Sequence, residues 1–146
     1  MAISEKLKKF LVDELSSLVR IPSISFEGFD SKQLDISAKA VAELLTRVGF
    51  QKVETLSEGR SPPYVVAEYN VDPKLPTALL YAHHDVQPPG REEVWQSPPF
   101  EPTIRNGRLY GQGSADDKAG IIGHAAALAH FLKPEFGGVG QKPPIN

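Results

Sequence analysis

Two polar clusters in the sequence contain residue types that could bind a metal ion. In the first, His83, His84 and Asp85 directly follow an apolar run that ends at Ala82. Residues two apart on a strand point to the same side, so His83 and Asp85 can share a site while His84 turns away. A histidine ligand commonly needs a carboxylate on its second ring nitrogen, which fixes the tautomer and the ring orientation. By itself this cluster is a weak signal: it favours ordinary polar loop residues, with a metal site as the alternative.

The second cluster is the pair Asp116 and Asp117, in a glycine-containing segment directly before a predicted helix. One aspartate there could simply cap the helix, because its carboxylate accepts backbone N–H groups at the positive end of the helix dipole. Two adjacent carboxylates, however, repel each other unless a cation or a proton lies between them. The glycines lack the spacing of a phosphate-binding loop. The functional interpretation of the pair is that one of its aspartates bridges metal ions. The alternative is that the pair only caps the helix.

Other candidate residues are better explained as structural. His124 and His130 lie six residues apart on one predicted helix, about 240° around its axis, so they cannot form a same-face metal pair. Trp95, followed closely by a Pro-Pro-Phe sequence, is expected to anchor a packed loop rather than to form a substrate platform. The chain has no Gly-x-Ser-x-Gly sequence, which gives a serine hydrolase little support.

Composition narrows the classes of function. The chain has 146 residues, of which 40% are hydrophobic and 23% charged, as in a globular domain. Its 16 basic and 18 acidic residues give a net charge of −2, so no basic excess is available to neutralise nucleic-acid phosphates. The absence of cysteine excludes disulfides, thiolate metal sites and cysteine nucleophiles. No secretory signal or apolar stretch of about 20 residues occurs, so we expect a cytoplasmic protein with no membrane partner.

Two amphipathic helices are predicted in the first third of the chain, where they serve as scaffold. Apolar residues at three- and four-residue steps predict a helix over residues 4–20, which Pro22 prevents from continuing. A second helix is predicted over residues 31–48, with Gly49 as its left-handed C-terminal cap.

Strand signals follow the two helices. Strands are predicted over residues 53–56, 64–69 and 77–83, and the apolar run in the third is typical of a strand buried on both faces. An Asn-Gly pair predicts a hairpin over residues 103–110, and an alanine-rich helix is predicted over residues 119–132. Helices mixed with strands in this way indicate an α/β sandwich, in which ligands bind beyond the carboxyl ends of the strands.

Several ordered motifs resemble those of a known family. They are YAHHDVQP at residues 81–88, WQSPPF at 95–100, GRLYGQGSADDKAG at 107–120 and LVRIPSIS at 18–25. In this order they resemble the co-catalytic zinc metallopeptidase family of carnosinase-like dipeptidases, acetylornithine deacetylase and succinyl-diaminopimelate desuccinylase. The resemblance implies a three-layer α/β/α catalytic domain with a mixed sheet. Residues 1–146 would be the N-terminal part of that domain, without its inserted dimerisation domain and C-terminal half.

The resemblance also implies roles for particular residues. His83 would ligate one zinc ion, Asp116 would bridge two, and Asp85 would serve catalysis by orienting His83. The peptide bond between Asp116 and Asp117 is expected to be cis, as is common in the family. The implied reaction is zinc-dependent hydrolysis of a peptide or amide bond in a dipeptide or an N-acyl amino acid, with cobalt or manganese as alternative metals. The parent protein is expected to be a homodimer.

The same family needs further residues that this chain does not supply. A Glu-Glu pair with the general base, another acidic ligand and a distant histidine all follow the Asp-Asp-Lys motif in the family. After Asp117 this chain has one carboxylate, Glu135, and two histidines, His124 and His130, none at a matching position. We therefore expect the chain to be inactive by itself.

Two other hypotheses remain open at this point. The chain could be a truncated, non-catalytic module that binds a partner through an exposed sheet edge and apolar surface. It could also be a nucleotide-binding α/β module, which the negative charge of the loop before the last helix disfavours. The chain further departs from the family pattern at Ala82 and Gln112, where glycine and arginine are usual.

Overall fold

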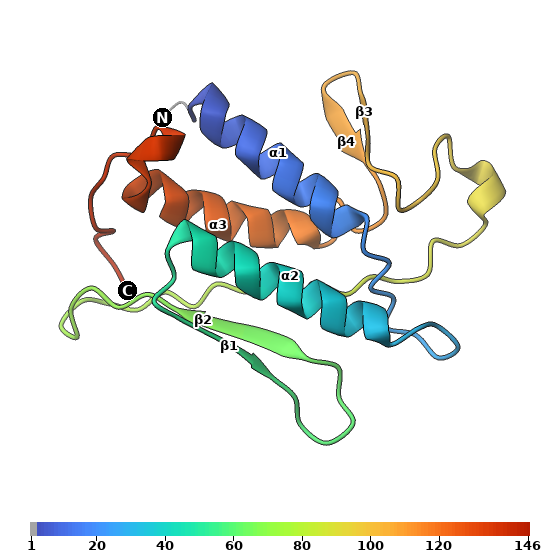
Figure 1. Cartoon of the computed structure of the whole chain (residues 1–146), viewed down its shortest axis with the longest axis horizontal. Helices are drawn as coiled ribbons and strands as arrows, with labels where there is room; N and C mark the ends of the chain where they lie inside the picture. Colours follow the sequence, from blue (N-terminus) through green and yellow to red (C-terminus); the bar gives the residue numbers. More distant parts are fainter. Residues whose placement is uncertain (1–2) are drawn as a thin grey trace.

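The computed structural model describes residues 3–146 and shows three helices that lie side by side (Figure 1). The helices are α1 (Glu5–Val19), α2 (Lys32–Val48) and α3 (Lys118–Leu132), and α3 lies between the other two. All three agree with the predicted ranges to within about two residues. None of the helices in residues 3–146 is long and apolar enough to cross a bilayer.

The ends of the first two helices have local causes. Ser4 caps α1, because its hydroxyl oxygen accepts a hydrogen bond of 3.1 Å from the backbone N–H of Leu7. The hydroxyl of Ser4 also donates to the carbonyl oxygen of Phe136 in the short 3-10 helix η2 (Pro134–Phe136). At the end of α2, Gly49 has a φ of 114°, a conformation that strongly favours glycine.

Replacing Ser4 with alanine is expected to lower the free energy of unfolding by about 1–2 kcal/mol, since the first turn of α1 loses its cap. The measurement is urea unfolding of the 146-residue chain followed by circular dichroism. Ser31→Ala is the matched control, because Ser31 precedes α2 without making a side-chain cap hydrogen bond. Equal losses in the two variants would contradict the capping role of Ser4.

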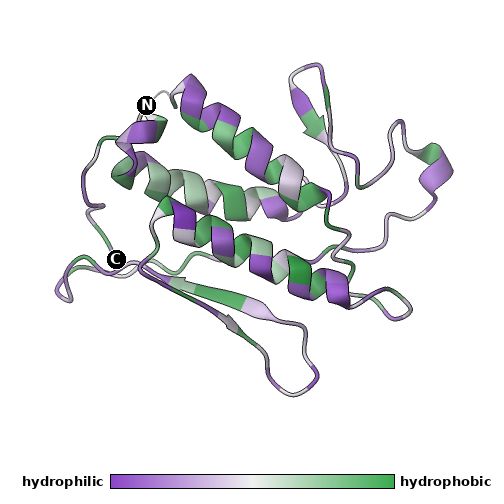
Figure 2. Ribbon diagram, in the orientation of Figure 1, coloured by the Kyte–Doolittle hydropathy of each residue, from purple (hydrophilic) through white to green (hydrophobic). Residues whose placement is uncertain are grey.

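The hydrophobic core lies where the three helices meet. Its buried side chains are Leu7, Leu11 and Leu18 of α1, Val41, Leu44, Leu45 and Val48 of α2, and Ile121, Ile122, Ala125 and Ala129 of α3. Polar and apolar residues alternate along α1 and α2, whereas α3 is apolar or nearly neutral over most of its length (Figure 2). A helix packed on two sides needs apolar residues around most of its circumference, which explains the composition of α3.

The strands of residues 3–146 form two antiparallel hairpins. β1 (Lys52–Leu56) pairs along its whole length with β2 (Tyr64–Glu68), and this hairpin packs against α2. β3 (Thr103–Arg105) pairs with β4 (Arg108–Tyr110). The four strands match the predicted ones.

The turn of the second hairpin has the predicted chemistry. Asn106 and Gly107 have φ angles of 50° and 73°, which are the positive values of a tight two-residue hairpin turn. Between the two hairpins runs a long loop that contains the short 3-10 helix η1 (Glu92–Val94).

The prediction of a buried strand over residues 77–83 is wrong. This segment carries a hydrogen bond from the backbone N–H of Ala78 to the carbonyl oxygen of Asn146, at 2.8 Å, but it has no strand ladder within the described residues. Leu79 and Tyr81 are 95% and 79% exposed. A strand needs a hydrogen-bonded neighbour on at least one side, and local apolarity cannot supply that neighbour.

A mixed sheet was predicted. In residues 3–146 the strand pairing consists of the two antiparallel hairpins and one parallel contact. This contact is an isolated bridge between Ile24 and Val86. It joins the loop after α1 to the residues directly after the histidine pair, and so positions the candidate site.

Candidate metal site

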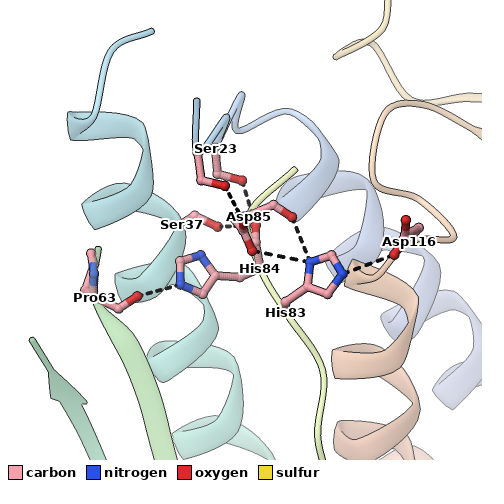
Figure 3. A network of polar contacts seen from close by, with 8 residues as sticks. Ser23, Ser37, Pro63, His83, His84, Asp85 and Asp116 are labelled. Carbon is pink, nitrogen blue, oxygen red and sulfur yellow. Dashed lines mark hydrogen bonds and ion pairs between the residues drawn. The ribbon is translucent and has the colours of Figure 1, made fainter. Parts of the chain in front are cut away.

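His83 and Asp116 come together although 33 residues separate them in the sequence. The Nε2 atom of His83 lies 3.1 Å from the Oδ1 atom of Asp116 (Figure 3). His83 follows the extended segment 77–82, and Asp116 lies in the loop that leads into α3. The two residues singled out as metal ligands from the sequence therefore face each other in space.

Asp85 lies on the other side of the His83 ring. The Nδ1 atom of His83 is 3.0 Å from the backbone carbonyl oxygen of Asp85 and 3.3 Å from its carboxylate Oδ1. The hydrogen bond of Nδ1 is to the backbone carbonyl oxygen of Asp85, and the carboxylate lies beside it at ion-pair distance. Asp85 therefore contacts the His83 ring through both its main chain and its side chain, and its orienting role stays a prediction.

This arrangement places Nε2 of His83 directly beside the carboxylate of Asp116. When Nδ1 carries the proton of a neutral imidazole, Nε2 presents a lone pair, and the carboxylate of Asp116 presents another. Two lone pairs 3.1 Å apart repel each other unless a proton or a metal ion lies between them. Burial lowers the pKa of His83, but the hydrogen bond to Asp85 and the carboxylate of Asp116 outweigh it, so the pKa lies above its ordinary value.

The site opens onto a small pocket of about 160 Å³. The pocket is lined by His83, Asp85, Val86, Gln87, Gln112, Gly113 and Asp116. The side chain of Asp116 is 92% exposed and that of His83 is 36% exposed, so both are accessible to a solute. The amide of Gln112 donates to the carbonyl oxygen of Gln87 at 2.7 Å, and both residues line the pocket.

His84 turns away from the site, as the alternation along the chain predicts. Its Nε2 atom lies 2.9 Å from the carbonyl oxygen of Pro63, next to β2 (Figure 3). The backbone carbonyl oxygen of His84 accepts hydrogen bonds from the hydroxyls of Ser23 and Ser37. His84 therefore ties the extended segment to its neighbours.

Trp95 and His130, which were interpreted as structural, contact other parts of the scaffold and not the pocket. Trp95 donates from Nε1 to the carbonyl oxygen of Pro89 at 3.0 Å, which anchors the loop as expected. His130 packs edge-on against the ring of Phe131 on α3. The peptide bond between Asp116 and Asp117 is cis, so that expectation is confirmed.

Sequence reasoning from chemistry alone missed three supporting residues. The hydroxyl of Ser25 donates to Oδ2 of Asp85, and the ammonium group of Lys118 donates to the carbonyl oxygens of Leu18 and Ile21 at 2.8 and 2.9 Å. Ser23 donates to the backbone of His84, as described above. The available signals were the motifs at residues 18–25 and 107–120, which entered only through the family resemblance and without roles for Ser23, Ser25 or Lys118.

The side chains of His83 and Asp116 are of the types that bind a divalent metal, but they are too few to complete a metal site. One imidazole nitrogen and one carboxylate oxygen are donors that zinc accepts. Within residues 3–146, however, no group of three or more histidine and carboxylate side chains gathers around one point. A zinc site commonly takes three or four protein ligands, so His83 and Asp116 alone would supply only part of such a site.

Comparison with known proteins identifies relatives of the chain. Residues 79–138 match the family model described as "Peptidase family M20/M25/M40". The chain is 35% identical to a Cys-Gly metallodipeptidase of Schizosaccharomyces pombe, over 86% of this chain and 28% of that protein. It is 30% identical to a Beta-Ala-His dipeptidase of Rattus norvegicus, over 97% of this chain and 28% of that protein. A succinyl-diaminopimelate desuccinylase of Bordetella avium is 34% identical over 84% of this chain and 30% of that protein.

Solved structures agree with the sequence relatives. Human carnosine dipeptidase 1 matches with a TM-score of 0.82 and 27% identity, over 99% of this chain and 34% of that chain. A di-peptidase from Saccharomyces cerevisiae matches with a TM-score of 0.80 and 25% identity, over 95% of this chain and 30% of that chain. The family resemblance and the peptidase-like α/β fold class are thereby confirmed. The chain spans 28–30% of the length of the three curated relatives named above.

Proposed function

We propose, from the confirmed resemblance to peptidase family M20/M25/M40, that the protein containing this chain hydrolyses peptide or amide bonds with a divalent metal, namely zinc. The observation that supports this proposal most directly is the approach of His83 Nε2 to Asp116 Oδ1 beside an open pocket. His83 and Asp116 would hold the metal, and Asp85 would orient the His83 ring. When bound, the metal supplies the Lewis acidity that amide hydrolysis needs.

The substrate class is proposed from the relatives together with the site. The relatives are named as dipeptidases and as desuccinylases, so the proposed substrate is a dipeptide or an N-acyl amino acid. Residues 1–146 are proposed to be the N-terminal part of the catalytic domain of a homodimeric parent protein. A cytoplasmic location stays a prediction.

The contribution of this chain is tested by its own zinc affinity, measured by isothermal titration calorimetry with Zn²⁺ alone. We expect His83→Ala to weaken binding by at least about tenfold, because removing a ligand costs no less than removing a residue that orients one. His124→Ala is the matched control, since His124 is half-buried on α3 and does not line the pocket. Equal affinity in the wild-type chain and the His83→Ala variant would contradict the proposed ligand role.

The 146-residue chain by itself is expected not to hydrolyse dipeptides or N-acyl amino acids, even when zinc is added. His83 and Asp116 are two proposed ligands, and residues 3–146 contain no group of three or more histidine and carboxylate side chains that could hold a metal ion. The measurement is release of free amino acid from a dipeptide panel and from N-acyl amino acids. Zinc-dependent release that disappears in His83→Ala would overturn the expected inactivity.

A further inference from the structure

The loop after α1 is docked directly onto the candidate site. Ser23 and Ser25 lie on either side of Ile24, whose position is paired with Val86 in the parallel bridge. The backbone N–H of Ser25 donates to the carbonyl oxygen of Val86 at 3.2 Å, and the N–H of Val86 donates to the carbonyl oxygen of Ser23 at 2.8 Å. The loop and the residues after His83 therefore share a short stretch of strand-like pairing.

This docking brings a hydroxyl to the carboxylate of Asp85. The Oγ atom of Ser25 donates to Oδ2 of Asp85, while Oδ1 of the same carboxylate lies 3.3 Å from Nδ1 of His83. The side chain of Asp85 is 37% exposed. The terminal torsion of an aspartate is broad, so a partly exposed carboxylate rotates unless a partner fixes one of its oxygens.

The position of Ser25 is itself supported from two sides. Lys118, which is fully buried, donates to the carbonyl oxygens of Leu18 and Ile21 just before the loop. Ser23 is also fully buried and donates to the carbonyl oxygen of His84 at 2.6 Å. The loop thus has little freedom to carry Ser25 away from Asp85.

We propose that Ser25 is a positioning residue of the metal site. Its hydroxyl fixes one oxygen of Asp85 so that the other stays beside Nδ1 of His83, and this keeps Nε2 of His83 free to bind the metal. The inference rests on the proposed function, because that function supplies the metal. The effect of Ser25 on the orientation of the His83 ring does not depend on a bound metal.

The first test is a double-mutant cycle of zinc affinity on the 146-residue chain, with Ser25→Ala, Asp85→Ala and both together. Because Ser25 acts through Asp85, Ser25→Ala is expected to weaken Zn²⁺ binding by about tenfold in the wild-type background and hardly at all in the Asp85→Ala background. Ser25→Thr keeps the hydroxyl and is expected to restore the affinity. Equal losses in both backgrounds would show that Ser25 has only a structural role and would overturn the proposal.

The second test uses no metal and follows the His83 ring by NMR. At one fixed alkaline pH, the imidazole ¹⁵N shifts report the share of molecules with the proton on Nδ1. This share is expected to fall in Ser25→Ala and to stay unchanged in Ser17→Ala, whose hydroxyl donates only to Asp13 within α1.

The two tests separate the two proposals. If the wild-type chain does not bind zinc, the ligand role proposed for His83 and Asp116 fails, and the ring tautomer still decides the role of Ser25. If the tautomer of His83 is the same in the wild-type chain and in Ser25→Ala, the positioning role is overturned whatever the zinc affinity is.

Discussion

Replacing Gly113 with alanine is expected to lower the free energy of unfolding by about 2–4 kcal/mol. Gly113 has a φ of 76°, which costs a residue with a Cβ atom about 1 kcal/mol or more. A Cβ atom at this position would also lie 2.4 Å from Cγ1 of Val86, which is 2% exposed. Overpacking of this kind adds about 1–3 kcal/mol. Urea unfolding of the 146-residue chain measures the loss.

The same substitution is expected to weaken zinc binding. Val86 pairs with Ile24 and follows Asp85 directly, so displacing Val86 moves the backbone that carries the Asp85 carboxylate. Gly123→Ala is the control, because Gly123 lies on α3 and a Cβ atom there meets no atom within 4 Å. This control should be stabilised by about 0.5–1 kcal/mol through helix propensity alone. A Gly113→Ala variant as stable as the wild-type chain would refute the close packing against Val86.

Replacing Lys118 with methionine is expected to destabilise the chain by about 1–3 kcal/mol at neutral pH. Methionine can fill the space of the lysine stem, but the carbonyl oxygens of Leu18 and Ile21 then lose the ammonium group that donates to both. An unsatisfied buried acceptor costs about 1–3 kcal/mol, and removing the buried charge offsets part of that cost. Chemical unfolding of both chains at the same pH gives the difference.

The destabilisation by Lys118→Met is expected to increase with pH. Burial lowers the pKa of Lys118 from 10.5 to about 8. Between these two values the unfolded chain binds more protons at this position than the folded chain, so the folded wild-type chain gains stability as the pH rises. From about pH 7 to about pH 9 the expected gain is about 1.4 kcal/mol, and Lys118→Met lacks it. A stability difference between the two chains that is constant over this range would contradict the lowered pKa.

Features that depend on a few neighbouring residues were predictable from the sequence. The limits of the helices follow from apolar spacing and from residues such as Gly49, whose positive φ ends α2. The second hairpin follows from Asn106 and Gly107, because their positive φ angles are a local property of that pair. The opposite directions of His83 and His84 follow from the alternation of side chains in extended backbone, which needs no tertiary contact.

The assembly of the candidate site depended on contacts between distant segments. His83 and Asp116 are 33 residues apart, Ser25 and Asp85 are 60 apart, and Lys118 lies 97 residues from Ile21, which accepts its hydrogen bond. Local preferences do not specify which distant segments pack together. The family resemblance supplied roles for His83 and Asp116, but the supporting contacts of Ser25 and Lys118 became visible only in the fold.

The segment over residues 77–83 also shows that local sequence does not specify which segments pack together. Its apolar residues are typical of a buried strand, yet Leu79 and Tyr81 are exposed and the segment has no strand ladder within the described residues. The apolar character of a side chain determines how favourable its burial is. Burial itself requires a second surface against which the side chain can pack. In this chain the local pattern therefore determines the helices, the hairpins and the direction of His83, and packing between the loop after α1 and the start of α3 determines whether these side chains form a site.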